Sequence, residues 1–237
     1  MAPIVERQLQ LPGSGILYDA SRLRKPAQEL FTREYWASRG SHVEVAGGRA
    51  SVSFIRTEEA SWVLRHYRRG GLIAKLLDDQ YLWLGAGRTR SFVEWRRLAE
   101  LRNRELPVPA PVAARYVRSG LVYRADLITE ELPPSKTLAN LMAELDAQAW
   151  QAVGKTVARF HAQGVHHADL NAHNILLGES GAVYVLDFDR GRIRARGTWE
   201  EQVLARLKRS LEKIARQRTE ARFSDREWGW LMEGYAG

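Results

Sequence analysis

Runs in which apolar and polar residues alternate follow residue 40, and this alternation predicts β-strands. Turn residues separate the runs, so we expect short connections and antiparallel pairing. Residues 1–40 carry few regular signals, and there we expect only a helix around 27–31 that ends near Gly40. The runs are 42–45, 51–55, 61–65, 112–117 and 121–127.

Apolar residues at helical spacing predict helices in the rest of the chain. The first covers 90–101 with an inner face of Val93, Leu98 and Leu101, and Pro107 and Pro109 prevent its continuation. The stretch 135–145 reads as one short helix.

Two longer helices are predicted in the second half of the chain. Asp146 caps the first of them, and Gly164 ends it. Its apolar stripe, which we expect in the core, is Trp150, Val153, Val157 and Phe160. The second helix carries the apolar face Trp199, Val203, Leu207, Leu211 and Ile214.

A β-hairpin is predicted between these two helices, with strands at 174–177 and 182–186 and a turn from Gly178 to Gly181. A hairpin brings its two ends together, so we expect Asn174 and Asp187 to meet at one point. Amide and carboxylate oxygens are suitable ligands for a hard cation such as Mg²⁺.

Asp169, a few residues before the hairpin, completes a set of groups suited to phosphoryl transfer. This reaction needs a carboxylate beside the attacking hydroxyl and oxygen ligands for Mg²⁺. We therefore assign Asp169 as the base that orients the hydroxyl and accepts its proton, and Asn174 and Asp187 as metal ligands. Each of the three alone is more commonly a turn residue; the case rests on their joint spacing with a His, a Leu and a Phe.

The spacing of this stretch resembles the catalytic loop of protein kinases. His167-Ala168-Asp169-Leu170 followed by Asn174 matches H-x-D-L-x-x-x-N, and Asp187-Phe188-Asp189 stands where that family has D-F-G. The resemblance implies an α+β, bilobal fold with an antiparallel N-lobe sheet, one N-lobe helix and a mainly helical C-lobe. We then expect an N-terminal extension at 1–40, an N-lobe at 41–129, a hinge at 130–134 and a C-lobe at 135–237 with a basic C-terminal helix.

Several residues of the expected N-lobe are candidates for binding ATP. The Gly47-Gly48 turn would lie over the phosphates, because glycine lets the backbone approach closely. Arg65 ends the third strand, where a kinase has lysine, and is the preferred phosphate anchor; Lys75 is its competitor. Glu94 is the expected helix partner of either cation.

The expected hinge is the other candidate for nucleotide contact. The stretch 128–134 breaks the strand pattern, and backbone groups near Glu130 and Leu132 would bind adenine. The side chains there need not be specific.

The chain is strongly basic, and this favours anionic partners. It has 237 residues, a formal charge of +8 and no Cys, and no apolar run reaches the length of a membrane span. We therefore expect a cytosolic, soluble protein without disulfides. Arg68, Arg69 and Arg190 are candidates for substrate binding. The C-terminal helix carries a basic face that suits an anionic membrane surface, although a solvated face is the more common explanation: Lys208, Arg209, Lys213, Arg216 and Arg218.

Longer phrases give a closer resemblance, to the bacterial lipopolysaccharide kinases of the Kdo/heptose family. It runs from about Val63 to Arg192 through LRHYRRGGLIAKL, RTRSFVEW, PVPAPVAARYV, LVYRADLITEELP, HHADLNAHNILL and LDFDR. The chain departs from protein kinases at Asp189, which replaces glycine, and it lacks an A-P-E segment.

This second resemblance implies a specific reaction. ATP and Mg²⁺ would be used to phosphorylate a hydroxyl of Kdo, at the 4-position, on a Kdo-bearing lipid A precursor at the cytoplasmic face of the inner membrane. Asp169 would be the base and Asn174 and Asp187 the metal ligands. Protein substrates are not expected, since the chain after the catalytic stretch is short.

Three other classes of function stay open on the sequence. An aminoglycoside- or choline-type phosphotransferase shares the Asp and Asn logic, but its pocket for cations would be acidic. A non-catalytic kinase-like binding module is favoured only by arginine at position 65. A nucleic-acid binder rests on the high pI alone, without a recognised motif, so no nucleic-acid partner is expected.

Overall fold

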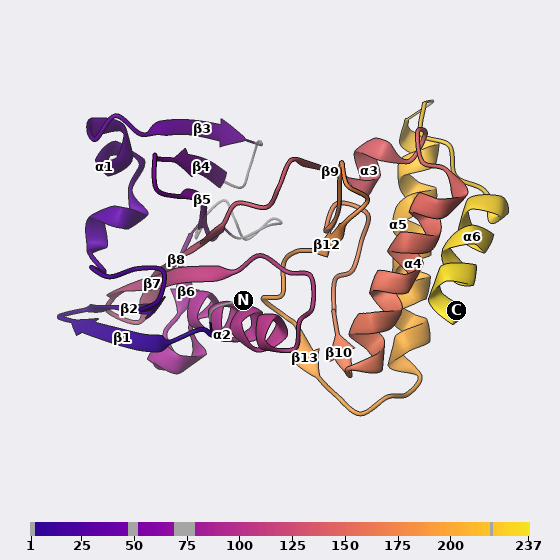
Figure 1. Ribbon diagram of the computed structural model, residues 1–237. Coiled ribbons are helices and arrows are strands. Elements are labelled where there is room, and N and C mark those ends of the chain that lie inside the picture. The colour runs from indigo at the N-terminus through magenta and orange to yellow at the C-terminus, as the bar shows by residue number, and fades with distance from the viewer. Residues whose placement is uncertain (1–2, 47–51, 69–78, 219) are drawn as a thin grey trace. The chain divides into compact units, whose positions relative to one another are not determined.

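The computed structural model describes residues 3–46, 52–68, 79–218 and 220–237, and it divides into two units (Figure 1). Unit 1 contains Met1–Arg104 and Pro109–Glu131, and unit 2 contains Glu105–Val108 and Leu132–Gly237. The break at residue 131 lies within the stretch 130–134 that was predicted to be a hinge; its role as a hinge stays a prediction.

An antiparallel sheet dominates unit 1. Its strands follow the order β1-β2-β7-β8-β5-β4-β3, and β6 pairs with β8. The sheet and the helices of both units agree with the predicted mixture of helix and antiparallel strand. The strands are β1 (Glu6–Leu11), β2 (Ser14–Asp19), β3 (His42–Ala46), β4 (Val52–Arg56), β5 (Ser61–His66), β6 (Tyr81–Leu82), β7 (Pro111–Ser119) and β8 (Val122–Glu130).

The first 40 residues are more regular than expected. They form the hairpin β1–β2, and β2 pairs with β7 in the sheet. β1 is an edge strand with mainly exposed side chains, and β2 is buried on both faces, so neither shows the alternation that marks a half-buried strand. A 3₁₀ helix, η1 (Gln28–Phe31), and the short helix α1 (Arg33–Ser38) stand in place of the single helix predicted around 27–31, and α1 ends close to the predicted end at Gly40.

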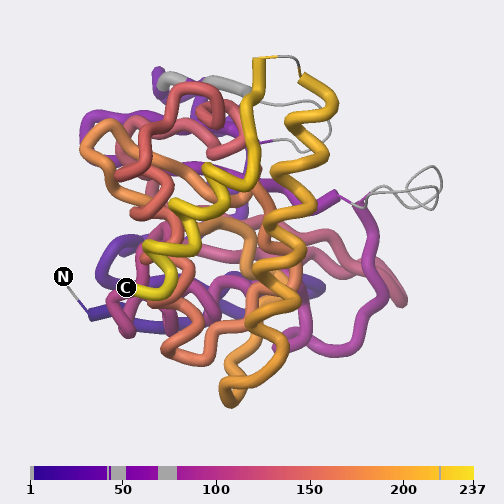
Figure 2. The backbone as a smooth tube through the Cα atoms, turned by 90° about the vertical axis from the view of Figure 1, so that its right-hand side faces the viewer, coloured from indigo at the N-terminus to yellow at the C-terminus, as the bar shows by residue number. Residues whose placement is uncertain are grey.

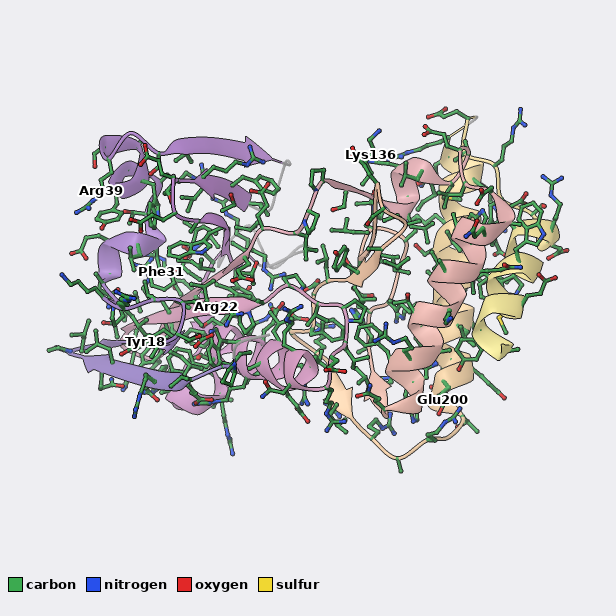
Figure 3. All side chains as sticks on the ribbon, viewed as in Figure 1. Tyr18, Arg22, Phe31, Arg39, Lys136 and Glu200 are labelled. Carbon is green, nitrogen blue, oxygen red and sulfur yellow. The ribbon has the colours of Figure 1, made fainter. Side chains whose placement is uncertain are left out.

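A buried carboxylate joins the open end of the β1–β2 hairpin. The buried carboxylate of Asp19 accepts hydrogen bonds from the backbone of Val5 and Ser21 and pairs with Arg22. Burial opposes the charge on Asp19, but these hydrogen bonds lower its pKa below the ordinary value. Tyr18 and Arg22 can be followed in Figure 3.

One long helix packs on the sheet of unit 1. After the 3₁₀ turn η3 (Ala86–Arg88), helix α2 (Arg90–Asn103) buries Leu98 and Leu101 as predicted, whereas Val93 is only half-buried. Phe92 and Trp95 are fully buried and carry more of the inner face. β8 continues to Glu130, so the predicted break at 128 comes too early: Thr129 pairs with Val63 of β5.

Unit 2 is mainly helical. The predicted helix 135–145 is wrong in its first part, because residues 135–137 pair with β11 as a short strand and only one helical turn follows. The elements are β9 (Ser135–Thr137), α3 (Leu138–Leu141), α4 (Ala147–Ala162), β10 (Val165–His166), β11 (Ile175–Gly178), β12 (Val183–Val185), β13 (Arg192–Ile193), α5 (Trp199–Gln217) and α6 (Asp225–Ala236).

The three long helices of unit 2, which are α4, α5 and α6, lie side by side (Figures 1 and 2). The side chain of Asp146 caps α4 by accepting a hydrogen bond from Ala149 N at 2.8 Å, and Gly164, with φ of 71°, follows its end. The apolar stripe predicted for α4 and the apolar face predicted for α5 are both buried. These predictions are confirmed.

Two glycines let α4 and α6 approach closely. A Cβ added to Gly154 of α4 would lie 1.9 Å from the Leu231 carbonyl oxygen of α6. A Cβ on Gly234 of α6 would lie 2.0 Å from the Gln151 carbonyl oxygen of α4. Because both neighbours are backbone atoms, even alanine would push the helices apart.

We expect Gly154→Ala and Gly234→Ala each to destabilise unit 2, by on the order of 1–3 kcal/mol as overpacked cores do. Gly229→Ala on α6 is the matched control, since nothing lies within 4 Å of its Cβ position. This control should be neutral or stabilise by up to about 1 kcal/mol, because alanine favours helix. Urea unfolding of the three variants measures these differences, and equal behaviour of all three would contradict the close contact.

A buried histidine joins the same helices. His161 of α4 is 2% exposed, and its Nδ1 lies 2.8 Å from the hydroxyl of Tyr235 in α6. Burial lowers the pKa of His161 from its ordinary value of 6.5 to about 4. The ring is therefore neutral in the folded protein at neutral pH.

Acid should destabilise unit 2 through His161. In the unfolded chain His161 binds a proton below pH 6.5, whereas in the folded chain it does so only below about pH 4. Stability is therefore lost as pH falls through this window. Between pH 7.5 and 5 the loss from this group is about 2 kcal/mol. His161→Gln, which does not titrate, should lose correspondingly less stability in urea unfolding at the two pH values. The same loss as in the wild type would remove His161 as its source.

Candidate active site

The loop between β10 and β11 is held by a buried imidazole. Nε2 of His167 lies 2.8 Å from the Leu186 carbonyl oxygen, and Nδ1 lies 3.2 Å from the backbone nitrogen of Asp169. A carbonyl only accepts and an amide N–H only donates, so these bonds require a neutral ring with its proton on Nε2. His167 therefore positions the loop.

Asp169 has a fixed backbone and an outward carboxylate. Its carbonyl oxygen accepts hydrogen bonds from the side-chain amides of Asn171 at 2.8 Å and Asn174 at 3.1 Å. Its side chain is 55% exposed, and Oδ1 accepts a hydrogen bond from Nη1 of Arg206 at 2.8 Å. In the part of the chain that the structure describes, no donor bonds Oδ2.

The predicted hairpin is confirmed as β11–β12, and its register places the candidate metal ligands at its open end. Ile175 pairs with Val185, and Leu186 N donates to the Asn174 carbonyl oxygen at 2.9 Å. Asp187 is the next residue and has φ of 65°, which turns the chain sharply there.

These residues fit a magnesium ion that also binds phosphate and water. Among the described residues no group of three or more His, Asp or Glu could hold a metal. Mg²⁺, however, takes one or two carboxylates and keeps water and phosphate as further ligands. The amide nitrogen of Asn174 donates to the Asp169 carbonyl oxygen, and the Oδ1 of Asn174 accepts no hydrogen bond from the described residues. An amide oxygen and a carboxylate are hard ligands of the required kind.

Phe188 ties this end of the hairpin to the core of unit 2. Its side chain is fully buried, stacks on Phe160 of α4 at 5.6 Å and meets the edge of His167 at 4.7 Å. A Cβ on Gly191 would lie 3.0 Å from the Phe188 ring, so glycine lets the chain turn closely around it. Core packing thus fixes Phe188 on one side of Asp187, and backbone hydrogen bonds fix Leu186 on the other.

A second cluster lies in unit 1. Arg65 of β5 forms an ion pair with Glu94 of α2, which is 2% exposed, and both bond the hydroxyl of Tyr67. Burial and the Glu94 carboxylate raise the pKa of Tyr67 well above its ordinary value. The sequence suggested the pair of Arg65 and Glu94 but missed Tyr67. Binding of phosphate by Arg65 stays a prediction.

The other residues predicted to bind the nucleotide come from the expected hinge and from the expected N-lobe. The side chain of Glu130 pairs with Arg22 at 2.8 Å, and its N–H donates to the Ala110 carbonyl. Leu132 is the half-buried residue with which the second segment of unit 2 begins. The N–H of Glu130 is used within unit 1, so any contact with adenine must come from other backbone groups. Gly47, Gly48 and Lys75 lie outside the described residues.

The basic residues predicted to bind the substrate or a membrane are partly exposed, partly ion-paired, and in one case outside the described residues. Arg68 and Arg190 are exposed, and Arg69 lies outside the described residues. On α5, Lys208 pairs with Asp225 and Arg216 with Glu212, whereas Arg209 and Lys213 are exposed and bond no described residue. In the described chain no helix is both long and apolar enough to span a bilayer.

Arg206 is the residue of this site that the sequence did not reveal. It stands on the exposed side of α5, far along the chain from Asp169, and periodicity marks it only as a surface position. The contact depends on how α5 packs against the loop.

Comparison with known proteins gives a consistent result. Residues 33–235 match the lipopolysaccharide kinase (Kdo/WaaP) family. Proteins named 3-deoxy-D-manno-octulosonic acid kinase from Stenotrophomonas maltophilia (strain R551-3) and Xanthomonas campestris pv. campestris (strain B100) are each 48% identical to this chain. A protein of the same name from Xylella fastidiosa (strain 9a5c) is 46% identical. Each match covers 86% of this chain and 82% of the relative.

The family match spans most of the chain, and it includes the loop of Asp169, the hairpin that ends in Asp187 and the helix α5. The expected resemblance to lipopolysaccharide kinases is thereby confirmed, and the chain is an enzyme of the kinase class. This protein belongs to the lipopolysaccharide kinase (Kdo/WaaP) family.

Proposed function

We propose that this chain transfers the γ-phosphoryl group of ATP to the 4-hydroxyl of Kdo on a lipid A precursor. The observation that carries the proposal is the Asp169 carboxylate, presented outward on a loop that His167 and Asn174 hold at its backbone. The names of the similar proteins, 3-deoxy-D-manno-octulosonic acid kinases, support Kdo as the acceptor.

In the proposed reaction Asp169 handles the proton. Its Oδ2 accepts the proton of the acceptor hydroxyl while the hydroxyl oxygen forms a bond to the γ-phosphorus and the bond to the β,γ-bridging oxygen breaks. His167 contributes by holding the loop, since its two ring nitrogens are already occupied. Because both the N–H and the carbonyl oxygen of Asp169 are held by hydrogen bonds, the carboxylate needs little reorganisation to reach the hydroxyl.

Asn174 and Asp187 would hold Mg²⁺, which supplies charge neutralisation on the phosphate oxygens when bound. Their placement at the open end of one hairpin supports this role. We further propose that Arg65, oriented by Glu94 and Tyr67, binds the α- and β-phosphates in unit 1. Lys75 is the alternative anchor.

We also propose that units 1 and 2 are the N-lobe and C-lobe of a protein-kinase-like fold, with residues 130–134 as the hinge. The antiparallel sheet with helix α2 in unit 1 and the mainly helical unit 2 support this assignment. The protein would act as a peripheral protein on the cytoplasmic side of the inner membrane, where a lipid acceptor is accessible.

Asp169→Asn should abolish transfer and leave the fold intact. We expect kcat to fall by about 10²- to 10⁴-fold, the usual contribution of a general base, with little change in ATP binding. Asp225→Asn is the matched control, since the side chain of Asp225 is 96% exposed at the start of α6. Transfer of labelled phosphate to a Kdo-lipid acceptor measures the effect, and near-normal turnover by Asp169→Asn would exclude this residue from the mechanism.

Asn174→Ala and Asp187→Asn should raise the Mg²⁺ concentration needed for half-maximal activity. Each change removes one hard oxygen ligand or its charge, so metal affinity should fall. Asp187→Asn leaves the hydrogen bonds of the Asp169 loop in place, whereas Asn174→Ala also removes the bond from its amide to the Asp169 carbonyl oxygen. Activity titrated with Mg²⁺ at saturating ATP measures this, and Mg²⁺-dependent protection of the protein by ATP in thermal unfolding gives a second readout. An unchanged Mg²⁺ dependence in both variants would refute the assignment.

Arg209 and Lys213 of α5 should contribute to binding an anionic membrane, because they are the members of the predicted basic face that are exposed and bond no described residue. Each cation near such a surface is worth about 1 kcal/mol, so Lys213→Gln should weaken binding about fivefold. Lys155→Gln, on the exposed side of α4, is the control. Sedimentation with vesicles containing phosphatidylglycerol measures binding, which should also weaken with salt; salt-independent or absent association would disprove membrane contact.

A further inference from the structure

The pair of Arg206 and Asp169 contributes little to stability. The guanidinium lies 2.8 Å from the carboxylate, yet the two side chains are 49% and 55% exposed. Ion pairs at this exposure usually contribute less than about 1 kcal/mol. A charged residue held against the candidate base therefore calls for another explanation.

Helix α5 fixes the position of Arg206 relative to the loop. Val203, Leu207 and Leu211 are buried and pack the helix onto unit 2. One turn beyond Arg206, the hydroxyl of Ser210 accepts a hydrogen bond from Ala172 N of the loop at 3.2 Å. Residues four apart lie on one helix face, so α5 contacts the loop through Ser210 and presents Arg206 beside Asp169.

Most of the hydrogen-bonding capacity of Arg206 is unused. A guanidinium has five N–H donors in a planar fork. Within the described part of the chain, Arg206 makes the single hydrogen bond to Asp169 Oδ1. The remaining donors are available, at half-exposed positions, for a second anion that lies next to the carboxylate.

We propose that Arg206 forms the subsite that binds the carboxylate of the sugar acid acceptor. Arginine is suited to a carboxylate because its fork can make two parallel hydrogen bonds. Arg206 would then hold the acceptor from its acidic group while Oδ2 of Asp169 faces the hydroxyl to be phosphorylated. Asp169 Oδ1 orients the guanidinium, so one carboxylate serves both substrate positioning and proton transfer. This assignment rests on the proposed function, since it takes Kdo as the acceptor.

The test combines a change in the protein with a change in the acceptor. Wild type, Arg206→Gln and Arg206→Lys are assayed with the soluble methyl glycoside of Kdo and with its carboxamide, which lacks the negative charge. We expect the wild type to prefer the carboxylate by about 10- to 100-fold in kcat/KM, the range for charged hydrogen bonds. Arg206→Gln should lose this preference, mainly through KM for the acceptor, with KM for ATP unchanged. Arg206→Lys should restore it in part.

Arg216→Gln is the matched control, because Arg216 lies on the same helix and its side chain is 80% exposed. It should keep the preference of the wild type. If Arg206→Gln still prefers the carboxylate, or if it changes kcat equally for both acceptors, Arg206 acts on Asp169 alone and the assignment is overturned. If Arg206→Gln weakens transfer only to an acceptor that carries lipid phosphates, and not to the soluble glycoside of Kdo, Arg206 binds phosphate and the assignment is also overturned. Absence of transfer by the wild type to any Kdo acceptor would overturn the proposed function and this subsite together.

Discussion

The hydrogen bonds of one neutral imidazole determine the geometry on which the candidate site depends. His167 donates to the Leu186 carbonyl and accepts from the Asp169 amide, so it joins the loop of Asp169 to the hairpin that precedes Asp187. The ring is buried against Phe188, which itself stacks on α4. The carboxylate of Asp169 can be directed to solvent in this arrangement because the backbone N–H and carbonyl of the same residue are already hydrogen-bonded.

Local signals predicted the parts of the site that lie close together in the chain. The alternating strands and the glycine turn determined the β11–β12 hairpin, and antiparallel pairing then brought its two ends together whatever the rest of the fold. The stripe of α4 was equally readable, since a helix in the core must bury one face. Such features need no knowledge of distant residues.

Other parts depended on contacts that no local pattern encodes. β9 has the composition of a helix start, but pairing with β11 makes it a strand. The edge strand β1 is polar because solvent covers it, and β2 lacks alternation because both faces are buried. Arg206 and Tyr67 reach the two clusters from surface or loop positions, so their roles emerge only with tertiary packing.

The two contacts that α5 makes with the loop have a consequence for how the sequence of this helix can change. Arg206 and Ser210 touch the loop from one face, and one added or deleted residue between them would rotate one contact away from the other by about 100°. Substitutions on the outer face leave this register intact. Helix α5 is therefore expected to tolerate substitutions on its outer face far better than the insertion or deletion of a residue.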